Sequence, residues 1–241
     1  MPEVDGLPVL IVGDVHGDLE RLFQALTPYP PDEWHTVFLG DLVDGGDFGV
    51  GALRYTRDRP NTTVILGNHE ILMLWTLWDR RVMSLWASVG GKLHDLQELA
   101  KDEPLQDWLV QRPLLLKLPD GTLVQHNDAD FYGRLVGHDA ADPVGAINEE
   151  GSRLLREHDY ATLWDVMSPG GMFRTSRTRL EQWLRRTGAT RLVHGHNPHS
   201  LSTPDAYQDG LAIDFDGGLS GYYGSRYRRR SALAASVGPL T

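Results

Sequence analysis

Residues 9–17 read VLIVGDVHG, an unbroken apolar run that ends at a glycine and is followed by an aspartate and a histidine. A short apolar run closed by glycine is typical of a buried β-strand that ends in a tight turn. Polar side chains just past such a strand lie at the carboxyl edge of a sheet, where open α/β folds bind ligands. The run therefore predicts a buried strand whose end carries Asp14 and His16 into a binding site.

The same pattern occurs twice more in the first 70 residues. Residues 36–45 read TVFLGDLVDG, and residues 62–70 read TTVILGNHE. Carboxylate, imidazole and amide oxygen together suit a divalent metal ion of borderline hardness. Turn chemistry alone explains isolated Asp and Asn residues, but it does not explain three matched strand ends. These ligands exceed what a single three-ligand site needs, so the sequence predicts a hydrolytic centre with two ions.

Two strands in the second half of the chain also end in histidine. Residues 123–128 read LVQHND, and residues 192–198 read LVHGHNP. With these two segments, the sequence offers six candidate metal ligands: Asp14, His16, Asp41, Asn68, His126 and His196. If one carboxylate bridges, this set fills most of the coordination positions around two metals roughly 3.5–4 Å apart.

Composition narrows the class of protein. The chain has 241 residues, 41% of them hydrophobic, which is enough for one large α/β domain with a sizeable core. The net charge of −10 argues against a nucleic-acid polymer as partner. The chain has no cysteine, and therefore no disulfide or thiolate site. The N-terminal segment resembles neither a signal peptide nor a membrane span, so we expect a cytoplasmic protein with no membrane contact.

Periodicity predicts strand–helix alternation in the first half and antiparallel strands in the second. Helices are expected at residues 18–26, 50–57, 70–82, 92–110, 143–157 and 177–186. Beyond the first three strands, further strands are expected at residues 114–118, 123–126, 191–194, 211–215 and, as an edge strand, 222–229. This order predicts an α/β sandwich of two face-to-face mixed β-sheets flanked by helices. We expect a single domain over residues 1–241, with a lid or insertion at about 128–175.

In this order, the five segments resemble the calcineurin-like metallophosphoesterase superfamily, and more narrowly its phosphoprotein phosphatase branch. That branch carries the motifs GDxHG, GDxxDRG and GNHE, followed by a strand-end histidine and a GH motif. The resemblance spans Asp14 to His196, which is most of the chain. It implies two divalent metal ions as cofactors. Manganese is favoured, and iron and zinc also fit nitrogen and oxygen ligands.

The resemblance also implies a role for each matching residue. Asp14 and His16 would hold the first metal ion, and Asp41 would bridge both ions. The second metal ion would be held by the set Asn68, His126 and His196.

The catalytic pair that the resemblance implies is His69 and Asp44. His69, oriented by Asp44, would be the general acid that protonates the departing oxygen. The nucleophile would be a hydroxide between the two cations, because metal binding lowers the pKa of water from 15.7 towards about 7. A histidine paired with a carboxylate holds its proton ready near neutral pH.

Two positions depart from the family pattern. Gly45 stands where the family has an arginine that grips the phosphoryl oxygens of a monoester, and losing that contact costs on the order of 1.5–3 kcal/mol of binding. We expect Arg174 or Arg177 to contact the substrate phosphate instead. Asn127 and Asp128 follow His126, where the family has a glycine. The extra charge of Asp128 would either select a harder ion or repel substrate.

These features favour a phosphomonoesterase of the serine/threonine protein phosphatase type. A hydrolase of dinucleoside polyphosphates or other nucleotides is the alternative, since the chain is compact and the arginine position is altered. A catalytically silent phosphate-binding protein is a remoter alternative, against which the intact pair His69 and Asp44 argues. The expected partner is therefore a phosphorylated protein or a nucleotide substrate.

Two further features receive no functional role. His194 lies two residues before His196 and is expected to be a core histidine or to lie behind the ligands. The cluster Arg226, Arg228, Arg229 and Arg230 is expected on a solvated sheet edge, where charge discourages aggregation.

Overall fold

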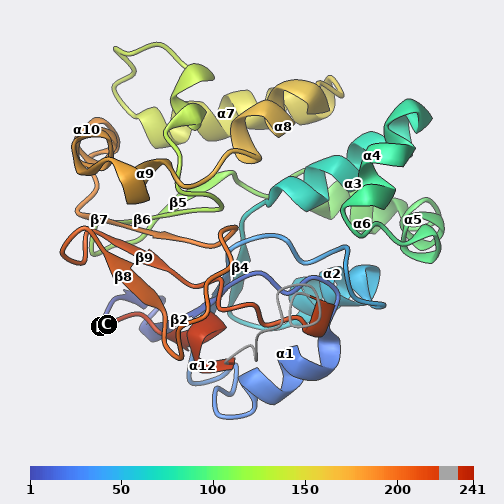
Figure 1. Cartoon of the computed structure of the whole chain (residues 1–241), viewed down its shortest axis with the longest axis horizontal. Helices are drawn as coiled ribbons and strands as arrows, with labels where there is room; N and C mark the ends of the chain where they lie inside the picture. The colour runs from blue at the N-terminus through green and yellow to red at the C-terminus, as the bar shows by residue number, and fades with distance from the viewer. Residues whose placement is uncertain (223–232) are drawn as a thin grey trace.

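The computed structural model describes residues 1–222 and 233–241, which form two five-stranded sheets with helices outside them (Figure 1). The first sheet has the order β1-β2-β3-β4, with β10 also paired to β2, and the second has the order β5-β6-β7-β9-β8. Both sheets mix parallel and antiparallel pairs. The predicted α/β sandwich of two mixed sheets is therefore confirmed.

The strands of the two sheets are short. The first sheet consists of β1 (Glu3–Val4), β2 (Leu7–Val12), β3 (His35–Phe38), β4 (Thr62–Val64) and β10 (Val237–Pro239). The second consists of β5 (Leu115–Lys117), β6 (Thr122–Gln125), β7 (Arg191–His194), β8 (Asp205–Tyr207) and β9 (Ala212–Asp214).

The helices in the first half of the chain are α1 (Leu19–Leu26), α2 (Gly49–Asp58), α3 (Asn68–Trp78), α4 (Met83–Ser88), α5 (Leu93–Leu99) and α6 (Glu103–Leu109). Those in the second half are α7 (Pro143–Arg156), α8 (Tyr160–Met167), α9 (Met172–Thr175), α10 (Arg177–Thr187) and α12 (Leu233–Ser236). Short 3-10 turns cover η1 (Arg80–Val82) and η2 (Phe131–Arg134).

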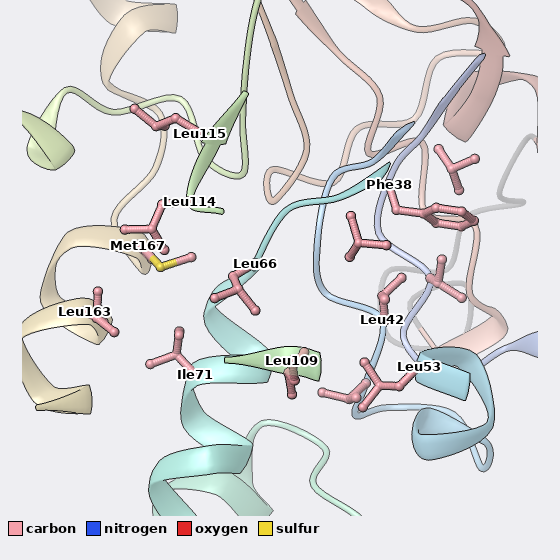
Figure 2. Close-up of a cluster of buried hydrophobic side chains, with 14 of the residues drawn as sticks. Phe38, Leu42, Leu53, Leu66, Ile71, Leu109, Leu114, Leu115, Leu163 and Met167 are labelled. Carbon is pink, nitrogen blue, oxygen red and sulfur yellow. The ribbon is translucent and has the colours of Figure 1, made fainter. Parts of the chain in front are cut away.

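Strand periodicity divides the buried side chains between two cores. In β2, Val9 and Ile11 join a cluster with Val124 and Val193 of the second sheet, whereas Leu10 joins the cluster beneath the helices. Successive side chains of a strand point to opposite faces, so each sheet packs on its partner with one face and on helices with the other. Figure 2 shows part of the helix-side core.

The parallel pairs bring the predicted motifs to one edge. β2, β3 and β4 are parallel neighbours, and β6 runs parallel to β7. The segments that follow these strands are the ones quoted above, so the topology gathers residues separated by more than a hundred positions in the sequence.

Two helix predictions were wrong in extent. The helix expected at 92–110 is broken into α5 and α6, because Pro104 has no N–H with which to continue the hydrogen bonds of α5. Asp102 caps the new start by accepting a hydrogen bond from the Leu105 N–H, 3.2 Å away. The helix expected to reach residue 82 ends at Trp78.

Other expectations meet the structure differently. The strands expected at 114–118 and 123–126 are confirmed as β5 and β6, which pair as an antiparallel hairpin, and the helix expected at 177–186 is α10, which ends before left-handed Gly188. Apart from Tyr222, the expected edge strand at 222–229 and its arginine cluster lie outside the described residues. Residues 128–175 contain η2, α7, α8 and α9. Their role as a lid, like the single-domain boundary, stays a prediction.

Within residues 1–222 and 233–241, no helix combines the length and apolar character that a membrane crossing requires.

The N-terminus of α2, which follows the Asp41–Gly45 turn, depends on a side chain from α5. The buried Asp95 carboxylate accepts hydrogen bonds from the N–H groups of Gly49 and Val50, each at 3.0 Å. We expect Asp95→Ala to lower the free energy of unfolding by about 1–3 kcal/mol, because it leaves these buried donors unsatisfied. Urea denaturation measures the change. The exposed Asp107 of α6 is the control, and an equal loss in Asp107→Ala would contradict this account.

Candidate metal centre

Four of the predicted site residues adopt a left-handed backbone, which residues other than glycine rarely do. The φ angles are 46° at His16, 49° at Asp41, 65° at Asp44 and 68° at His196. Such conformations cost energy and persist only where the surrounding structure fixes them. Their concentration in the turns after β2, β3 and β7 shows that these turns are shaped to aim particular side chains.

The buried Asp41 carboxylate lies at the centre of the converging turns. Its Oδ1 accepts a hydrogen bond from the His69 N–H at 2.9 Å and lies 3.4 Å from His126 Nε2. Its Oδ2 lies 3.8 Å from His16 Nε2 and 3.9 Å from His69 Nε2. Asp41 thus lies near the side-chain nitrogens of histidines that follow strands of both sheets.

Each predicted histidine ligand is oriented by a backbone carbonyl on its outer side. His16 Nδ1 lies 3.2 Å from Val43 O, His126 Nδ1 lies 2.8 Å from Leu39 O, and His196 Nε2 lies 2.9 Å from Ser168 O. A carbonyl can only accept, so the outer nitrogen carries the proton and the inner nitrogen keeps its lone pair. This is the arrangement by which proteins fix a metal-binding imidazole.

The inner atoms of the second group fit a cation. His126 Nε2 lies 3.1 Å from His196 Nδ1 and 2.8 Å from Asn68 Oδ1. In neutral rings, all three of these atoms are acceptors. Three acceptors that converge in a buried space need a proton or a metal ion among them, so the donor set suits a divalent cation with nitrogen and oxygen ligands.

Asp14 lies beside both groups. Its two carboxylate oxygens accept the His196 N–H, each at 3.1 Å, and Oδ2 lies 3.8 Å from His16 Nε2. Among residues 1–222 and 233–241, two sets of three side chains could each hold an ion: one comprises His16, Asp41 and His69, and the other comprises Asp41, His126 and His196. The structure therefore brings all six predicted ligands together, with Asp41 common to both sets.

Burial shapes the charges of the site. Burial raises the pKa of Asp14 well above its usual range, and the neighbouring carboxylates add to the rise. Burial would also raise the pKa of Asp41, but the charges of His126 and His69 outweigh it and lower that pKa well below its usual range. Burial, with a smaller effect of His69, lowers the pKa of His16 to about 3, which favours the neutral ring that a metal binds.

The ring of His69 contacts the Asp44 carboxylate, which is in turn fixed by a hydrogen bond from Trp86. His69 Nδ1 lies 2.8 Å from Asp44 Oδ2, and Trp86 Nε1 donates to Asp44 Oδ1 at 2.8 Å. Burial alone would lower the pKa of His69, but the carboxylates of Asp41 and Asp44 raise it to about 9. The ring therefore keeps a proton at neutral pH.

Sequence reasoning missed two residues that support the site. Glu70 accepts hydrogen bonds from the backbone N–H groups of Asp41, Leu42, Val43 and Gly67. Its position three residues after Gly67 was the available signal, because a glutamate there commonly bonds back to the start of its helix. Trp86 comes from α4, and no local pattern connects it to the GDxxD motif.

Gly45 is required by its surroundings. It has φ +84°, and its N–H donates to Gly90 O at 2.9 Å. A Cβ added there would lie 3.0 Å from Cδ1 of Tyr222. An arginine at this position would therefore strain the backbone and crowd an aromatic ring.

The two arginines expected to replace that contact are engaged elsewhere. Arg174 donates to Asp205 Oδ2 at 2.7 Å and to Asp214 Oδ2 at 3.3 Å, and it lines a pocket of about 440 Å³ that includes Asn197, next to His196. Arg177 pairs with Glu181 and Asp209. Contact of either side chain with substrate phosphate stays a prediction.

The Asn127-Asp128 pair connects neighbouring segments. Asn127 Nδ2 donates to Met167 O at 2.8 Å and to Pro169 O at 2.7 Å. Asp128 accepts from the Gly171 N–H and, at 2.8 Å, from Asn197 Nδ2. The pair thereby holds the 167–171 segment, which carries Ser168 O, against His196. The sequence predicted that Asp128 selects a harder ion or repels substrate. Its hydrogen bonds indicate a third role, in which Asp128 helps to position the proposed metal ligand His196.

His194 matches its expected role. It is fully buried, and its Nε2 lies 2.8 Å from the Tyr207 hydroxyl.

Comparison with known proteins identifies a family and several relatives. Residues 7–200 match the model of the calcineurin-like phosphoesterase family. A serine/threonine-protein phosphatase of Caenorhabditis elegans is 46% identical over 80 residues, which cover 30% of this chain and 17% of that protein. A symmetrical bis(5'-nucleosyl)-tetraphosphatase of Actinobacillus pleuropneumoniae is 30% identical over 161 residues, which cover 63% of this chain and 54% of that protein. The matches thus span about half or less of these relatives.

Solved structures share the fold. The cold-active protein-tyrosine phosphatase of a psychrophilic Shewanella superposes with a TM-score of 0.63 at 17% identity, covering 98% of this chain and 81% of that one. A protein serine/threonine phosphatase from Saccharomyces cerevisiae gives a TM-score of 0.58 at 15% identity, covering 86% and 66%. At these identities the likeness concerns the fold alone.

The Glu70 carboxylate leads to a stability prediction. Glu70→Gln replaces one acceptor oxygen by an NH₂ group that faces backbone donors. We expect a loss of about 1–3 kcal/mol of unfolding free energy for each N–H left without an acceptor, measured by urea denaturation. The exposed Glu103→Gln of α6 is the matched control. A Glu70→Gln variant as stable as this control would refute the assigned role.

Proposed function

Because the chain belongs to the calcineurin-like phosphoesterase family, we propose that it is a phosphoester hydrolase that works with two divalent metal ions. The observation that carries the proposal is the Asp41 carboxylate, which lies within 4 Å of His16 Nε2, His69 Nε2 and His126 Nε2. A single carboxylate placed between two sets of nitrogen donors is suited to bridge two cations.

In this proposal, Asp14 and His16 hold one ion and Asp41 contributes to both. The other ion is held by the set Asn68, His126 and His196. When bound, the ions supply an activated water and neutralise the phosphoryl oxygens. The carboxylates and imidazoles leave the choice of metal open to manganese, iron or zinc, with manganese favoured where oxygen ligands are numerous.

His69 would act as the general acid. Its Nδ1 is held by Asp44, so its Nε2 is the atom available to donate a proton to the leaving oxygen. Trp86 fixes the Asp44 carboxylate from its far side, which keeps the ring from turning. Positioning and charge stabilisation then account for catalysis without a covalent enzyme intermediate.

The acid favours a phosphomonoester of an alcohol, as in a phosphoserine or phosphothreonine protein. An alkoxide is a much more basic leaving group than a nucleotide phosphate, so it gains more from a proton donor held in place. Dinucleoside polyphosphate hydrolysis is the second candidate. It is supported by the similarity to the Actinobacillus bis(5'-nucleosyl)-tetraphosphatase over 63% of this chain.

Metal stoichiometry tests the paired site. We expect two Mn²⁺ ions per wild-type chain by elemental analysis, loss of both in Asp41→Asn, and retention of one in His196→Asn. Asparagine is chosen because it tolerates the left-handed backbone at both positions. The control His199→Asn removes a nearby ring that bonds to Asp214 O instead, and should keep two ions. A wild-type chain that binds no ion would refute the proposal.

The leaving group tests the acid and the substrate class together. We expect His69→Ala to lower kcat about 10²–10⁴-fold on a phosphoserine peptide. The loss should be much smaller on 4-nitrophenyl phosphate, whose phenolate leaves without help. Steady-state kinetics with Mn²⁺ measures both values.

Diadenosine tetraphosphate is the third substrate in that experiment. Greater wild-type kcat/KM on the phosphopeptide supports the monoesterase, whereas greater kcat/KM on the dinucleotide assigns the second candidate instead. Equal losses of kcat in His69→Ala on all three substrates would contradict a general-acid role.

A further inference from the structure

The geometry points to one more carboxylate at the metal centre. We propose that Asp216 supplies an anionic oxygen to the cation held by Asp14 and His16 and strengthens the binding of that ion. The inference rests on the proposed function, and it concerns a residue that none of the five motifs contains.

Asp216 lies against the turn that carries Asp14. It follows β9 of the second sheet, whereas Gly13 and Asp14 follow β2 of the first. A Cβ added to Gly13 would lie 2.1 Å from Phe215 O and 3.4 Å from the Asp216 nitrogen. The two backbones are therefore in direct contact, and the absence of a side chain at Gly13 permits it.

The Asp216 side chain is buried and only half satisfied. It is 1% exposed, and its Oδ1 accepts the Gly218 N–H at 3.2 Å. Its Oδ2 is buried with no hydrogen-bond partner among residues 1–222 and 233–241. A buried carboxylate oxygen is costly unless a donor or a cation compensates it.

Asp214, two residues earlier, provides the contrast. It is fully buried, but its Oδ2 receives a hydrogen bond from the Arg174 guanidinium at 3.3 Å, and its Oδ1 accepts the Asp216 N–H at 2.9 Å. One buried carboxylate thus has a cationic partner within the protein, and the other has an oxygen left over.

Electrostatics links Asp216 to the metal site. The negative charge of Asp216 acts on the buried carboxyl of Asp14. Two adjacent buried carboxylates repel each other unless a positive charge lies near both. A divalent cation at Asp14 removes this repulsion and satisfies the spare oxygen.

A third carboxylate has a consequence for the ion. It makes the Asp14 side of the centre richer in anionic oxygen than the His126 side, where imidazole dominates. Oxygen ligands suit manganese and magnesium, so this side would take the harder ion.

Calorimetric titration of the chelator-treated full chain with Mn²⁺ tests the proposal. We expect Asp216→Asn to weaken one of the two binding events about 10–100-fold and to leave the other unchanged. Asn keeps an acceptor for the Gly218 N–H. The matched control Asp214→Asn should bind both ions as the wild type does.

Thermal unfolding gives a second readout that a merely structural role would not produce. Without metal, Asp216→Asn should melt at a higher temperature than the wild type, because repulsion with Asp14 is gone. Adding Mn²⁺ should raise the Tm of Asp216→Asn by less than it raises the Tm of the wild type. Should the asparagine variant fail to fold, Asp216→Ser takes its place in both measurements.

The outcomes separate the two proposals. Wild-type binding of two ions with identical titrations for Asp216→Asn overturns the inference alone. Equally weakened Mn²⁺ binding in Asp216→Asn and Asp214→Asn also overturns the inference, because the loss would then come from removing any nearby negative charge rather than from a specific ligand. A wild-type chain that binds no ion overturns the proposed function itself.

Discussion

The site depends on one buried carboxylate that binds backbone rather than ligand. Glu70 accepts four N–H groups, three from the Asp41–Val43 turn after β3 and one from Gly67 after β4. These bonds hold the turn in which Asp41 adopts a left-handed backbone. The position of the shared carboxylate, and with it the spacing of the histidines around it, follows from this single anchor at the start of α3.

Much of the fold and the site could be predicted because the chemistry lies at strand ends. Apolar runs closed by glycine located β2, β3, β4 and β7, an apolar run ending in histidine located β6, and parallel pairing then gathered the polar residues that follow them. What could not be predicted came from long-range contacts. Trp86 reaches Asp44 from 42 positions away, and Asp216 reaches the Asp14 turn from the other sheet. No local pattern records either contact.

The departures from the family pattern have local causes. Gly45 has a backbone conformation that glycine favours, beside the ring of Tyr222, so the missing arginine reflects the shape of this turn. Asn127 and Asp128 stand where the family has a glycine, and their side chains make hydrogen bonds that connect the 167–171 segment to the end of β6. The break between α5 and α6 likewise follows from Pro104, a signal that a purely periodic reading overlooks.

The candidate ligands come from both sheets: Asp14, His16, Asp41 and Asn68 follow strands of the first, and His126 and His196 follow strands of the second. On the proposed function, bound ions would therefore clasp the two halves of the sandwich in a chain that has no cysteine to cross-link them. The stabilisation depends on the metal supply. At a free metal concentration 100 times Kd, binding adds about 2.7 kcal/mol to the free energy of unfolding, and it adds almost nothing when metal is scarce. Metal starvation would then threaten the persistence of the protein as well as its turnover.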